Sequence, residues 1–330
     1  MLEEAPLRSP DDYADRDVPS AVYASGLRQV YYQIRKASFM EDMSFRITDG
    51  ESDLACCLLT AAAMDGTDRA RLSNFGNPAT FWYAGGLSPE VKTRVANKGK
   101  KILKERLSRY PGAELAVADY FSHEQLNPLS MFALQDDAAV CSLSFSHAVP
   151  LEPSVEALHG AVRKRYRSFI NNAQRQFVFF VSDADTFIPE HMEQLHACHV
   201  SASGRDVYPP GFWNAFAGLV RAGKGYIVLA LLDGEAKGAA LQAVSAERAY
   251  YAIGAFDRSL DASGLSHGCL WAAMEYARNK GYAVFETGLT HYAACTSNIT
   301  EKEMNIGFFK RGFGGCNRPV MNITARITEK

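Results

Sequence analysis

Two titratable residues near the end of the chain occupy positions that suit catalysis. Glu286 closes a short apolar run at residues 283–286, which is typical of a strand. Its carboxylate should therefore point into a cleft and orient or deprotonate a bound group. His291 follows five residues later and is a second candidate base, because imidazole titrates near neutral pH. The competing interpretations are a surface glutamate at a strand end and an exposed loop histidine.

A basic run without an interspersed acid lies at the middle of the chain, between Glu156 and Asp183. Lys164 and Arg167 share one face of a predicted helix, an arrangement that suits the phosphates of a nucleotide-linked ligand or of tRNA. Tyr166 adds a surface for base stacking. The candidate binding residues in this run are Arg163, Lys164, Tyr166 and Arg167. The alternative is an ordinary solvated helix face, which most charge runs form.

Histidines and cysteines do not combine into a metal site. His191, His196 and His199 surround Cys198, but their spacing is not that of a zinc-binding helix, and no H-E-x-x-H motif is present. The seven cysteines include no C-x-x-C pair, so neither a zinc ribbon nor a disulfide framework is indicated. We expect no metal, and a reducing, cytoplasmic setting fits best.

Length and composition set the broad class. The chain has 330 residues, about twice a typical domain, with 47% apolar and 22% charged residues. A net charge of −2 argues against a protein that coats nucleic acid over its whole surface, and no DNA partner is expected. The start of the sequence lacks the pattern of a signal peptide, and no apolar stretch is long enough to span a bilayer. These features predict a soluble, cytoplasmic protein.

The rear half predicts a regular series of strands and helices. Apolar runs separated by turn residues indicate an antiparallel meander. A helix with a C-cap at Gly281 follows, and a later helix begins with a capping box formed by Thr300 and Glu303. In order, the predicted elements are strands 226–232, 239–246 and 249–256, helix 267–280, strand 283–286, helix 300–312 and strand 321–327.

The front half repeats part of this order. Its predicted elements are strands 54–64 and 79–83, a basic helix at 89–110, a Pro-Gly break and strand 115–120. A helix, a break and a short apolar strand therefore occur in both halves, which indicates a duplicated domain. The stretch Pro150–Pro153 is the expected boundary. The predicted organisation is an acidic lead-in at 1–20, a front domain at 21–152 and a rear domain at 153–330.

Three segments carry a resemblance to a known family. Val162–Phe177 resembles the basic helix of the FemAB-like GNAT acyltransferases, and Glu193–Trp213 is similar to the helix and Pro-Pro-aromatic loop of that family. Phe285–Gly315 begins with Phe-Glu-Thr-Gly and ends with IGFFKRGFGG, close to the family signature Phe-Lys-x-x-Phe-Gly. Glu286 replaces the usual aspartate, and the loop at 289–298 is longer than its family counterpart.

The resemblance implies an α+β fold with two GNAT-like domains, each a mixed, mostly antiparallel sheet flanked by helices. It also implies an N-acyltransferase. The best-known members move an amino acid from aminoacyl-tRNA onto an amine of a peptidoglycan precursor, whereas relatives linked to polysaccharide synthesis have other donors, acyl-CoA among them. The expected partners are therefore a small-molecule, peptidoglycan-precursor or polysaccharide-precursor acceptor and a tRNA. No bound cofactor is expected.

The resemblance also assigns site residues. Lys310 stands where the family places a lysine near the acyl end of the donor, and an ammonium there can stabilise an oxyanion or a phosphate. Phe309 would pack against the acyl group or a terminal base. Gly288, Tyr208 and Trp213 complete the candidate substrate-binding residues. The alternatives are a solvated lysine at a helix end and an aromatic core corner.

One loop of the sequence indicates which acyl donor the protein uses. GNAT enzymes that use acyl-CoA hold its pyrophosphate on a Gly-rich turn at a helix N-terminus. The corresponding candidates here are Gly264, Ser266, His267 and Gly268, with Ser266 replacing the second small residue. This departure favours a donor other than acyl-CoA, and the resemblance makes aminoacyl-tRNA the expected one. The alternatives are an acyl-CoA-dependent N-acetyltransferase acting on an amino sugar or small amine, and a binding module without catalytic activity.

Overall fold

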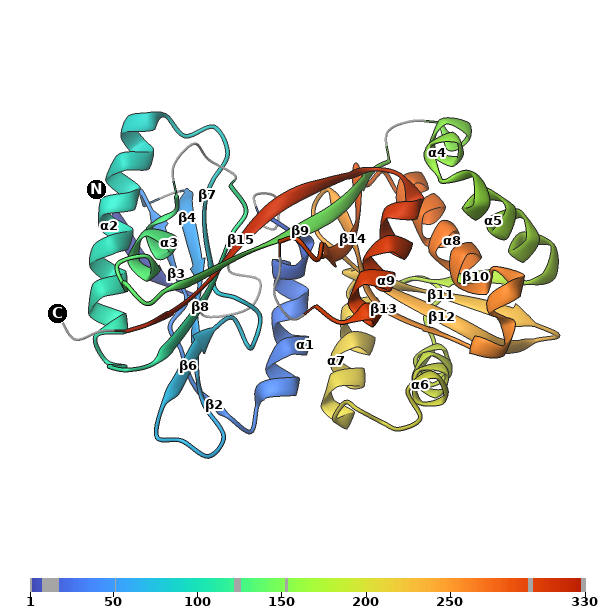
Figure 1. The fold of residues 1–330 in the computed structure, drawn as a ribbon, viewed down its shortest axis with the longest axis horizontal. Coiled ribbons are helices and arrows are strands. Elements are labelled where there is room, and N and C mark those ends of the chain that lie inside the picture. Colours follow the sequence, from blue (N-terminus) through green and yellow to red (C-terminus); the bar gives the residue numbers. More distant parts are fainter. Residues whose placement is uncertain are drawn as a thin grey trace.

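A computed structural model describes residues 2–7, 18–50, 52–121, 126–151, 154–295 and 299–327. Figure 1 shows two masses side by side that are connected by a pair of long strands. Helices flank mixed, mostly antiparallel sheets, which confirms the predicted α+β class. Parts of the predicted lead-in, boundary and long loop, at residues 8–17, 152–153 and 296–298, lie outside the described residues. None of the described helices is long and apolar enough to cross a membrane.

The front half combines short strands with three α-helices. The longest, α2 (Pro89–Leu107), begins where the Ser88 hydroxyl accepts the Val91 N–H, and its apolar face buries Val95 and Ile102. The other helices are α1 (Ser25–Arg35) and α3 (Pro128–Ala133). The strands are β1 (Glu3–Pro6), β2 (Phe39–Asp42), β3 (Phe45–Thr48), β4 (Asp53–Leu58), β5 (Thr60–Ala63), β6 (Ala70–Ser73), β7 (Thr80–Tyr83), β8 (Glu114–Asp119) and β9 (Val140–Pro150).

The rear half confirms the predicted element order. The meander is β11 (Gly225–Leu232), β12 (Glu235–Val244) and β13 (Arg248–Phe256), and the capping box of Thr300 and Glu303 starts a helix. The remaining strands are β10 (Val178–Ser182), β14 (Val284–Thr290) and β15 (Cys316–Arg326). The helices are α4 (Val155–Ala161), α5 (Lys164–Gln176), α6 (Pro189–Ser203), α7 (Pro210–Arg221), α8 (Leu265–Asn279) and α9 (Glu301–Lys310).

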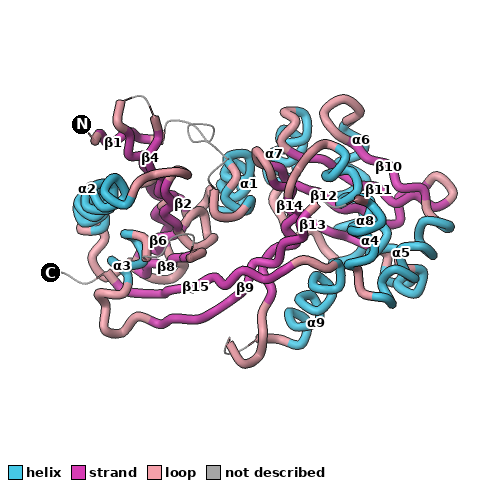
Figure 2. The backbone as a smooth tube through the Cα atoms, turned by 90° about the horizontal axis from the view of Figure 1, so that it is seen from above, coloured by secondary structure: helices cyan, strands magenta, loops and turns pink. Residues whose placement is uncertain are grey.

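One eleven-stranded sheet runs through both halves in the order β10-β11-β12-β13-β14-β9-β15-β8-β6-β5-β2. Its centre is the antiparallel pair β9–β15, which is paired from Cys316 opposite Ala148 to Thr324 opposite Val140. β9 also pairs with β14 of the rear half, and β15 also pairs with β8 of the front half. Figures 1 and 2 both show the two strands side by side across the molecule. A smaller sheet, β1-β3-β4-β7, completes the front half.

Each half of the chain contributes buried residues to the hydrophobic core of the other half. Ile323, Ala325 and Ile327, from the end of the chain, are buried in the core that β3, β4 and α2 form in the front half. In the other direction, Leu27 and Val30 of α1 are buried in the core beneath α7. α1 itself was missed by the sequence analysis, because it lies directly after the polar segment interpreted as a lead-in. The halves of the sequence are therefore not two independent packing units.

We predict that the sheet makes both halves unfold together. Ile323→Ala removes a buried side chain from the front core, which should lower the free energy of unfolding by about 2–4 kcal/mol. Urea unfolding followed by tryptophan fluorescence reports both halves, because Trp82 lies in front and Trp271 in the rear. We expect one transition, shifted to lower urea. Val140→Ala, at a 66% exposed position of β9, should change the free energy by less than about 0.5 kcal/mol. Two separate transitions would contradict this prediction.

Candidate active site

A cavity of about 210 Å³ lies where the two halves meet. It opens beside the point where β13 and β14 diverge, because these parallel strands pair only over Arg248–Tyr250 and Val284–Glu286. A register shift between Glu286 and Gly288 bends β14 at the same place. Bulges of this kind re-aim side chains next to functional sites. The lining comes from both halves: Ser20, Val22, Tyr23, Asn77, Pro78, Ala118, Tyr120, Ser146, Tyr250, Gly288, Leu289, Lys310, Val320 and Asn322.

Lys310 reaches this cavity from the last turn of α9. Its ammonium donates a hydrogen bond to the Leu289 carbonyl oxygen at 3.0 Å. Burial lowers the pKa of the Lys310 ammonium from 10.5 to about 8, because desolvation penalises the charged form. The side chain is therefore a cation at neutral pH that loses its proton within one to two pH units above neutrality. A group with this property is typical of catalytic sites.

Gly288 provides the space for this lysine. It has a φ of +88°, in the left-handed region that favours glycine. A Cβ added at Gly288 would lie 3.3 Å from Lys310 Nζ and 3.4 Å from Tyr250 Oη. The ammonium and the phenol therefore border one small space above the Gly288 backbone. The structure brings together Lys310 and Gly288, two of the residues predicted from the sequence.

Three tyrosines, Tyr23, Tyr120 and Tyr250, contribute phenol groups to the cavity wall. Tyr23 and Tyr120 meet edge to face, with ring centroids 5.8 Å apart, and Tyr23 donates to the Pro78 carbonyl oxygen at 3.1 Å. Burial raises the pKa of Tyr250 to about 12, so its phenol stays protonated and can donate a hydrogen bond. None of these tyrosines was predicted from the sequence. Two of them come from the front half, and only the folded chain places them opposite Lys310.

Glu286 lies beside the cavity, but its carboxylate is held on every side. Its side chain is only 2% exposed and forms an ion pair with Arg248 at 2.8 Å. The other oxygen accepts hydrogen bonds from the Ser20 hydroxyl at 2.5 Å and the Ala21 N–H at 3.2 Å. Glu286 thus fixes the segment that carries Val22 and Tyr23 into the cavity wall. The prediction that Glu286 ends a strand is wrong, because β14 continues to Thr290, and the side chain is not that of a surface glutamate. The contact with Ser20 has no local signal in the sequence.

His291 lies beside α9 but outside the cavity. Its backbone nitrogen lies 3.7 Å from the position that a Cβ on Gly307 would take, and it does not line the cavity. Its Nδ1 atom is buried without a hydrogen-bond partner among the described residues. The structure therefore does not bring His291 together with Lys310 at the cavity surface.

The basic helix and the Phe-Lys motif meet, although about 150 residues separate them. The Arg163 N–H donates to the Gly312 carbonyl oxygen at 2.9 Å. The guanidinium of Arg163 lies 3.9 Å from the ring centroid of Phe308. Gly312 is required here, because a Cβ would lie 1.9 Å from the Tyr166 ring. α5 therefore begins directly against the turn that follows Lys310.

Two of the basic candidates on α5 remain available to a ligand. Lys164 is exposed and Arg167 is partly exposed, and neither forms an ion pair with any residue that the structure describes. Tyr166, by contrast, is buried in an aromatic cluster with His267, Phe309 and Phe313. The ring of Tyr166 packs inside the protein and does not offer a free stacking face.

The predicted donor loop is covered by α5. Gly264, at φ +81°, caps the N-terminus of α8, and a Cβ there would lie 2.4 Å from the Phe169 carbonyl oxygen. Asn172 of α5 donates to the Ser263 carbonyl oxygen at 3.0 Å. Gly268 also faces α5, where a Cβ would meet Ala173 at 2.5 Å. These glycines therefore permit helix packing, a role that their sequence pattern alone does not distinguish from phosphate binding.

His267 fills the space next to this loop. Its ring centroid is 4.8 Å from that of Phe169 and 5.0 Å from that of Phe309. Burial, together with the nearby charge of Arg165, lowers the pKa of His267 to about 4, so the ring is neutral at pH 7. Ser266 is partly buried and its hydroxyl lies 3.4 Å from His267 Nδ1. Phe309 thus packs within the protein, one residue before the cavity lysine.

Tyr208 and Trp213, two of the predicted substrate-binding residues, lie outside the Lys310 cavity. Tyr208 stacks on Phe212 at 3.9 Å, and Trp213 is 5% exposed within the core shared by α1 and α7. Neither lines the Lys310 cavity. Within the described part of the chain, no group of three His, Cys, Asp or Glu side chains is arranged to hold a metal ion.

Comparisons with known proteins concern the fold and the middle of the chain. Residues 160–294 match the family model described as an acetyltransferase (GNAT) domain. This segment contains α5, the meander, α8 and all of β14, the strand that carries Glu286 and Gly288. No curated protein sequence matches the chain.

Solved structures share the fold over nearly the whole chain. A structure of FemX aligns with a TM-score of 0.68 at 11% identity and covers 97% of this chain and 96% of that one. The C-terminal domain of a protein assigned as a lysylphosphatidylglycerol synthetase, from Agrobacterium fabrum, gives 0.56 at 11% identity, covering 94% and 87%. L-PGS from Bacillus licheniformis gives 0.55 at 11% identity, covering 84% and 82%. At this identity the similarity concerns the fold alone.

We predict that Glu286 is a positioning residue for the segment at residues 20–23. Glu286→Ala leaves Arg248 without its partner and releases Ser20, which should lower the free energy of unfolding by about 3–5 kcal/mol in urea denaturation. The matched control is Glu235→Ala, which breaks an exposed pair with Lys237 and should lower the free energy of unfolding far less. Equal losses for the two variants would show that Glu286 does not hold the segment.

Proposed function

We propose that this chain is a GNAT acyltransferase of FemAB-like type and that it transfers an aminoacyl group from aminoacyl-tRNA to a primary amine. The acceptor amine would occupy the cavity between the two halves, as part of a cell-envelope, peptide or amino-sugar precursor. The observation that carries the proposal is the position of Lys310, a partly buried cation at a cavity lined by both halves of the chain.

The chemistry of the transfer fits these groups. The nitrogen lone pair of the acceptor attacks the carbonyl carbon of the aminoacyl ester, and the carbonyl oxygen becomes an oxyanion. The Lys310 ammonium and the Tyr250 phenol border one space and can both donate hydrogen bonds to that oxygen. When the intermediate collapses, the ester C–O bond breaks and the ribose hydroxyl leaves with a proton. The acceptor nitrogen loses its proton and becomes an amide.

The preference for a donor other than acyl-CoA rests on the packing of α5. The backbone of α5 approaches Gly264 so closely that a Cβ could not be accommodated. A pyrophosphate needs free N–H groups at such a helix start, and α5 occupies the approach to them. Next to this end, the rings of Tyr166, His267 and Phe309 fill the interior.

The basic residues of α5 offer a surface for tRNA. Lys164 and Arg167 lie on the helix whose N-terminus contacts the turn following Lys310. A tRNA backbone bound along this helix would bring its charged end toward the cavity. Phosphate contacts of this kind position a nucleic acid without reading its sequence. The acyl-CoA-dependent reaction is the second candidate, favoured by the description of the matching family model as an acetyltransferase.

We predict that Lys310 supports transfer as an ammonium. Lys310→Met should lower the rate of transfer from labelled aminoacyl-tRNA to a panel of amines, such as glucosamine and lysine-containing peptides, by about 10²–10³-fold. The matched control is Lys302→Met, which makes the same change at an exposed position of the same helix. Equal rates for the two variants would remove Lys310 from the mechanism.

The pH dependence of the transfer rate tests whether Lys310 acts as a charged ammonium. Because the pKa of Lys310 is lowered to about 8, the wild-type rate should fall as the pH rises above 8 and the ammonium disappears. Lys310→Arg, which stays charged, should abolish that fall. A fall above pH 8 that persists in Lys310→Arg would contradict this role.

We predict that charged tRNA stabilises the protein and that acetyl-CoA does not. At about 100 times its dissociation constant a ligand adds about 2.7 kcal/mol, or roughly 4 °C in the unfolding midpoint of a chain of this length. The tRNA shift should diminish steeply between low and moderate salt, because Lys and Arg contacts to phosphate release counterions.

A matched pair of variants tests whether α5 provides this surface. Lys164→Gln with Arg167→Gln should reduce the tRNA shift, whereas Arg94→Gln with Lys101→Gln, the same charge change on exposed positions of α2, should not. A shift with acetyl-CoA that is insensitive to salt would establish the acyl-CoA reaction instead. No shift with either donor would indicate a binding module.

A further inference from the structure

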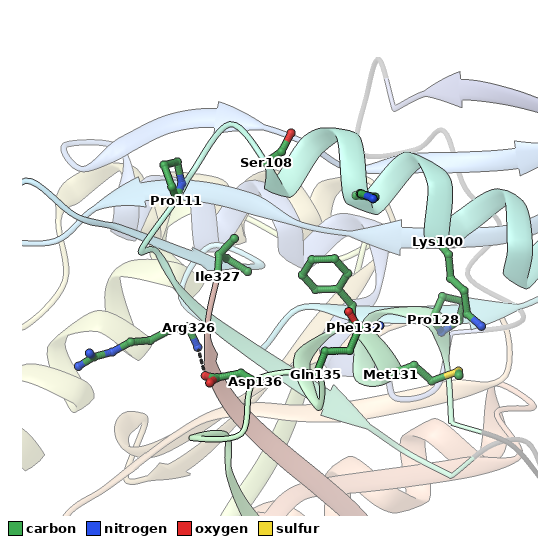
Figure 3. A pocket seen from close by; sticks show the side chains of 11 residues that line it. Lys100, Ser108, Pro111, Pro128, Met131, Phe132, Gln135, Asp136, Arg326 and Ile327 are labelled. Carbon is green, nitrogen blue, oxygen red and sulfur yellow. Dashed lines mark hydrogen bonds between the residues drawn. The ribbon is translucent and has the colours of Figure 1, made fainter. Parts of the chain in front are cut away.

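A second cavity, of about 470 Å³, lies in the front half between α2, α3 and the end of β15. Figure 3 shows Phe132 and Ile327 in the trough between α2 and α3, with Met131 at its edge. Most of the lining surface is apolar, and Met131 is 40% exposed although its neighbours pack into the core. A volume of this size suits a small organic molecule with an apolar body.

Two lysines give this cavity its charge. Lys100 and Lys104 lie one turn apart on α2 and both line the cavity. Figure 3 shows the Lys100 side chain extending from α2 toward Pro128 and Met131. Neither lysine forms an ion pair with an acid in the described part of the chain. Two exposed cations one turn apart repel each other, so an anion between them would relieve that repulsion.

The acidic residue of the cavity does not neutralise these lysines. Asp136 accepts the Arg326 N–H at 2.7 Å with one carboxylate oxygen and the Ala138 N–H at 3.0 Å with the other. These backbone contacts lower the pKa of the Asp136 carboxyl, which therefore stays ionised and directed at the backbone. Arg326 points away from the trough in Figure 3. The charge available to a ligand is therefore that of the α2 lysines.

We propose that this cavity is a binding site for an amphipathic anion, a molecule with an apolar body and a phosphate or carboxylate head. The body would lie on Phe132, Met131 and Ile327, and the head would lie between Lys100 and Lys104. No reacting group is involved, so the site binds its ligand without a chemical step. It is separate from the Lys310 cavity and shares none of its lining residues.

The two cavities are linked by one strand. Val320 and Asn322 of β15 line the Lys310 cavity, whereas Arg326 of the same strand and Ile327 directly after it line the second cavity. A ligand that orders the end of β15 therefore acts on the strand that also borders the candidate active site.

The test uses the full chain and the fluorescent anion 1-anilinonaphthalene-8-sulfonate, which has an apolar body of suitable size. The bound probe is displaced with decyl phosphate, decanoate, decyl glucoside or inorganic phosphate, each kept below its micelle concentration. We expect decyl phosphate or decanoate to displace it, and the stronger of the two identifies the preferred head group. The uncharged glucoside and inorganic phosphate should each be at least about tenfold weaker, because each lacks one half of the recognised chemistry.

Matched variants locate the site. Lys100→Gln with Lys104→Gln should lower the affinity for the tighter-binding anion by about fivefold, since each exposed charge pair contributes modestly. Arg94→Gln with Lys101→Gln, on the same helix but outside the cavity, and Lys310→Met, in the other cavity, should leave its affinity unchanged. The proposal is overturned if the control pair weakens binding equally, if Lys310→Met removes it, if decyl glucoside competes as well as the anions, or if the probe does not bind.

Discussion

The structure depends on one antiparallel strand pair that passes through both halves of the molecule. β9 and β15 lie at the centre of the eleven-stranded sheet, with β14 on one side and β8 on the other. Backbone hydrogen bonds fix the register of such a pair, and a shift by one residue would turn every buried side chain outward. The halves are therefore held in one geometry by the sheet itself. A cavity between them can have a defined shape for the same reason.

This constraint explains how a buried carboxylate contributes to the site. Glu286 satisfies Arg248 of the same half and Ser20 and Ala21 of the other. Burial of a charge costs free energy that partners offset only when their geometry is good. The sheet and the packing of α1 on α7 provide that geometry, because they bring the segment at residues 20–23 to a fixed position. The carboxylate in turn aligns Tyr23 with the cavity wall.

The sequence predicted elements that have their own local signals. The meander, α8 and α9 carry turns, caps and helical periodicity, and all were located within a few residues. α1 was missed because it begins without a side-chain cap and follows a polar segment. The duplicated order is also visible in the structure: α2, β8, α3 and β9 follow the front strands as α8, β14, α9 and β15 follow the meander. The exchange of β15 into the front core has no local signal, because an alternating strand does not specify its partner.

The candidate site, like the fold, could be predicted from the sequence only where a local motif marks it. Lys310 and Gly288 belong to short motifs, and the structure places them at one cavity. The stretch with Gly264, Ser266 and Gly268 was interpreted as a departure from a phosphate-binding loop, but close packing between helices also requires glycine, and α5 is the neighbour in this case. Tyr23 and Tyr120 could not be identified, since nothing in their surroundings along the sequence relates them to a lysine about 190 or more residues away. Tertiary contacts alone bring these groups together.

The chemistry of Lys310 is therefore a property of the assembled chain. Desolvation lowers the pKa of its ammonium, and the cavity that Lys310 lines has walls that include Tyr23, Pro78 and Tyr120 of the front half. An isolated rear half would lack these walls, and a lysine in water has a pKa of about 10.4. The front half thus tunes the cation even if none of its own groups touches the reacting atoms. This role gives a physical reason for two halves in one continuous sheet.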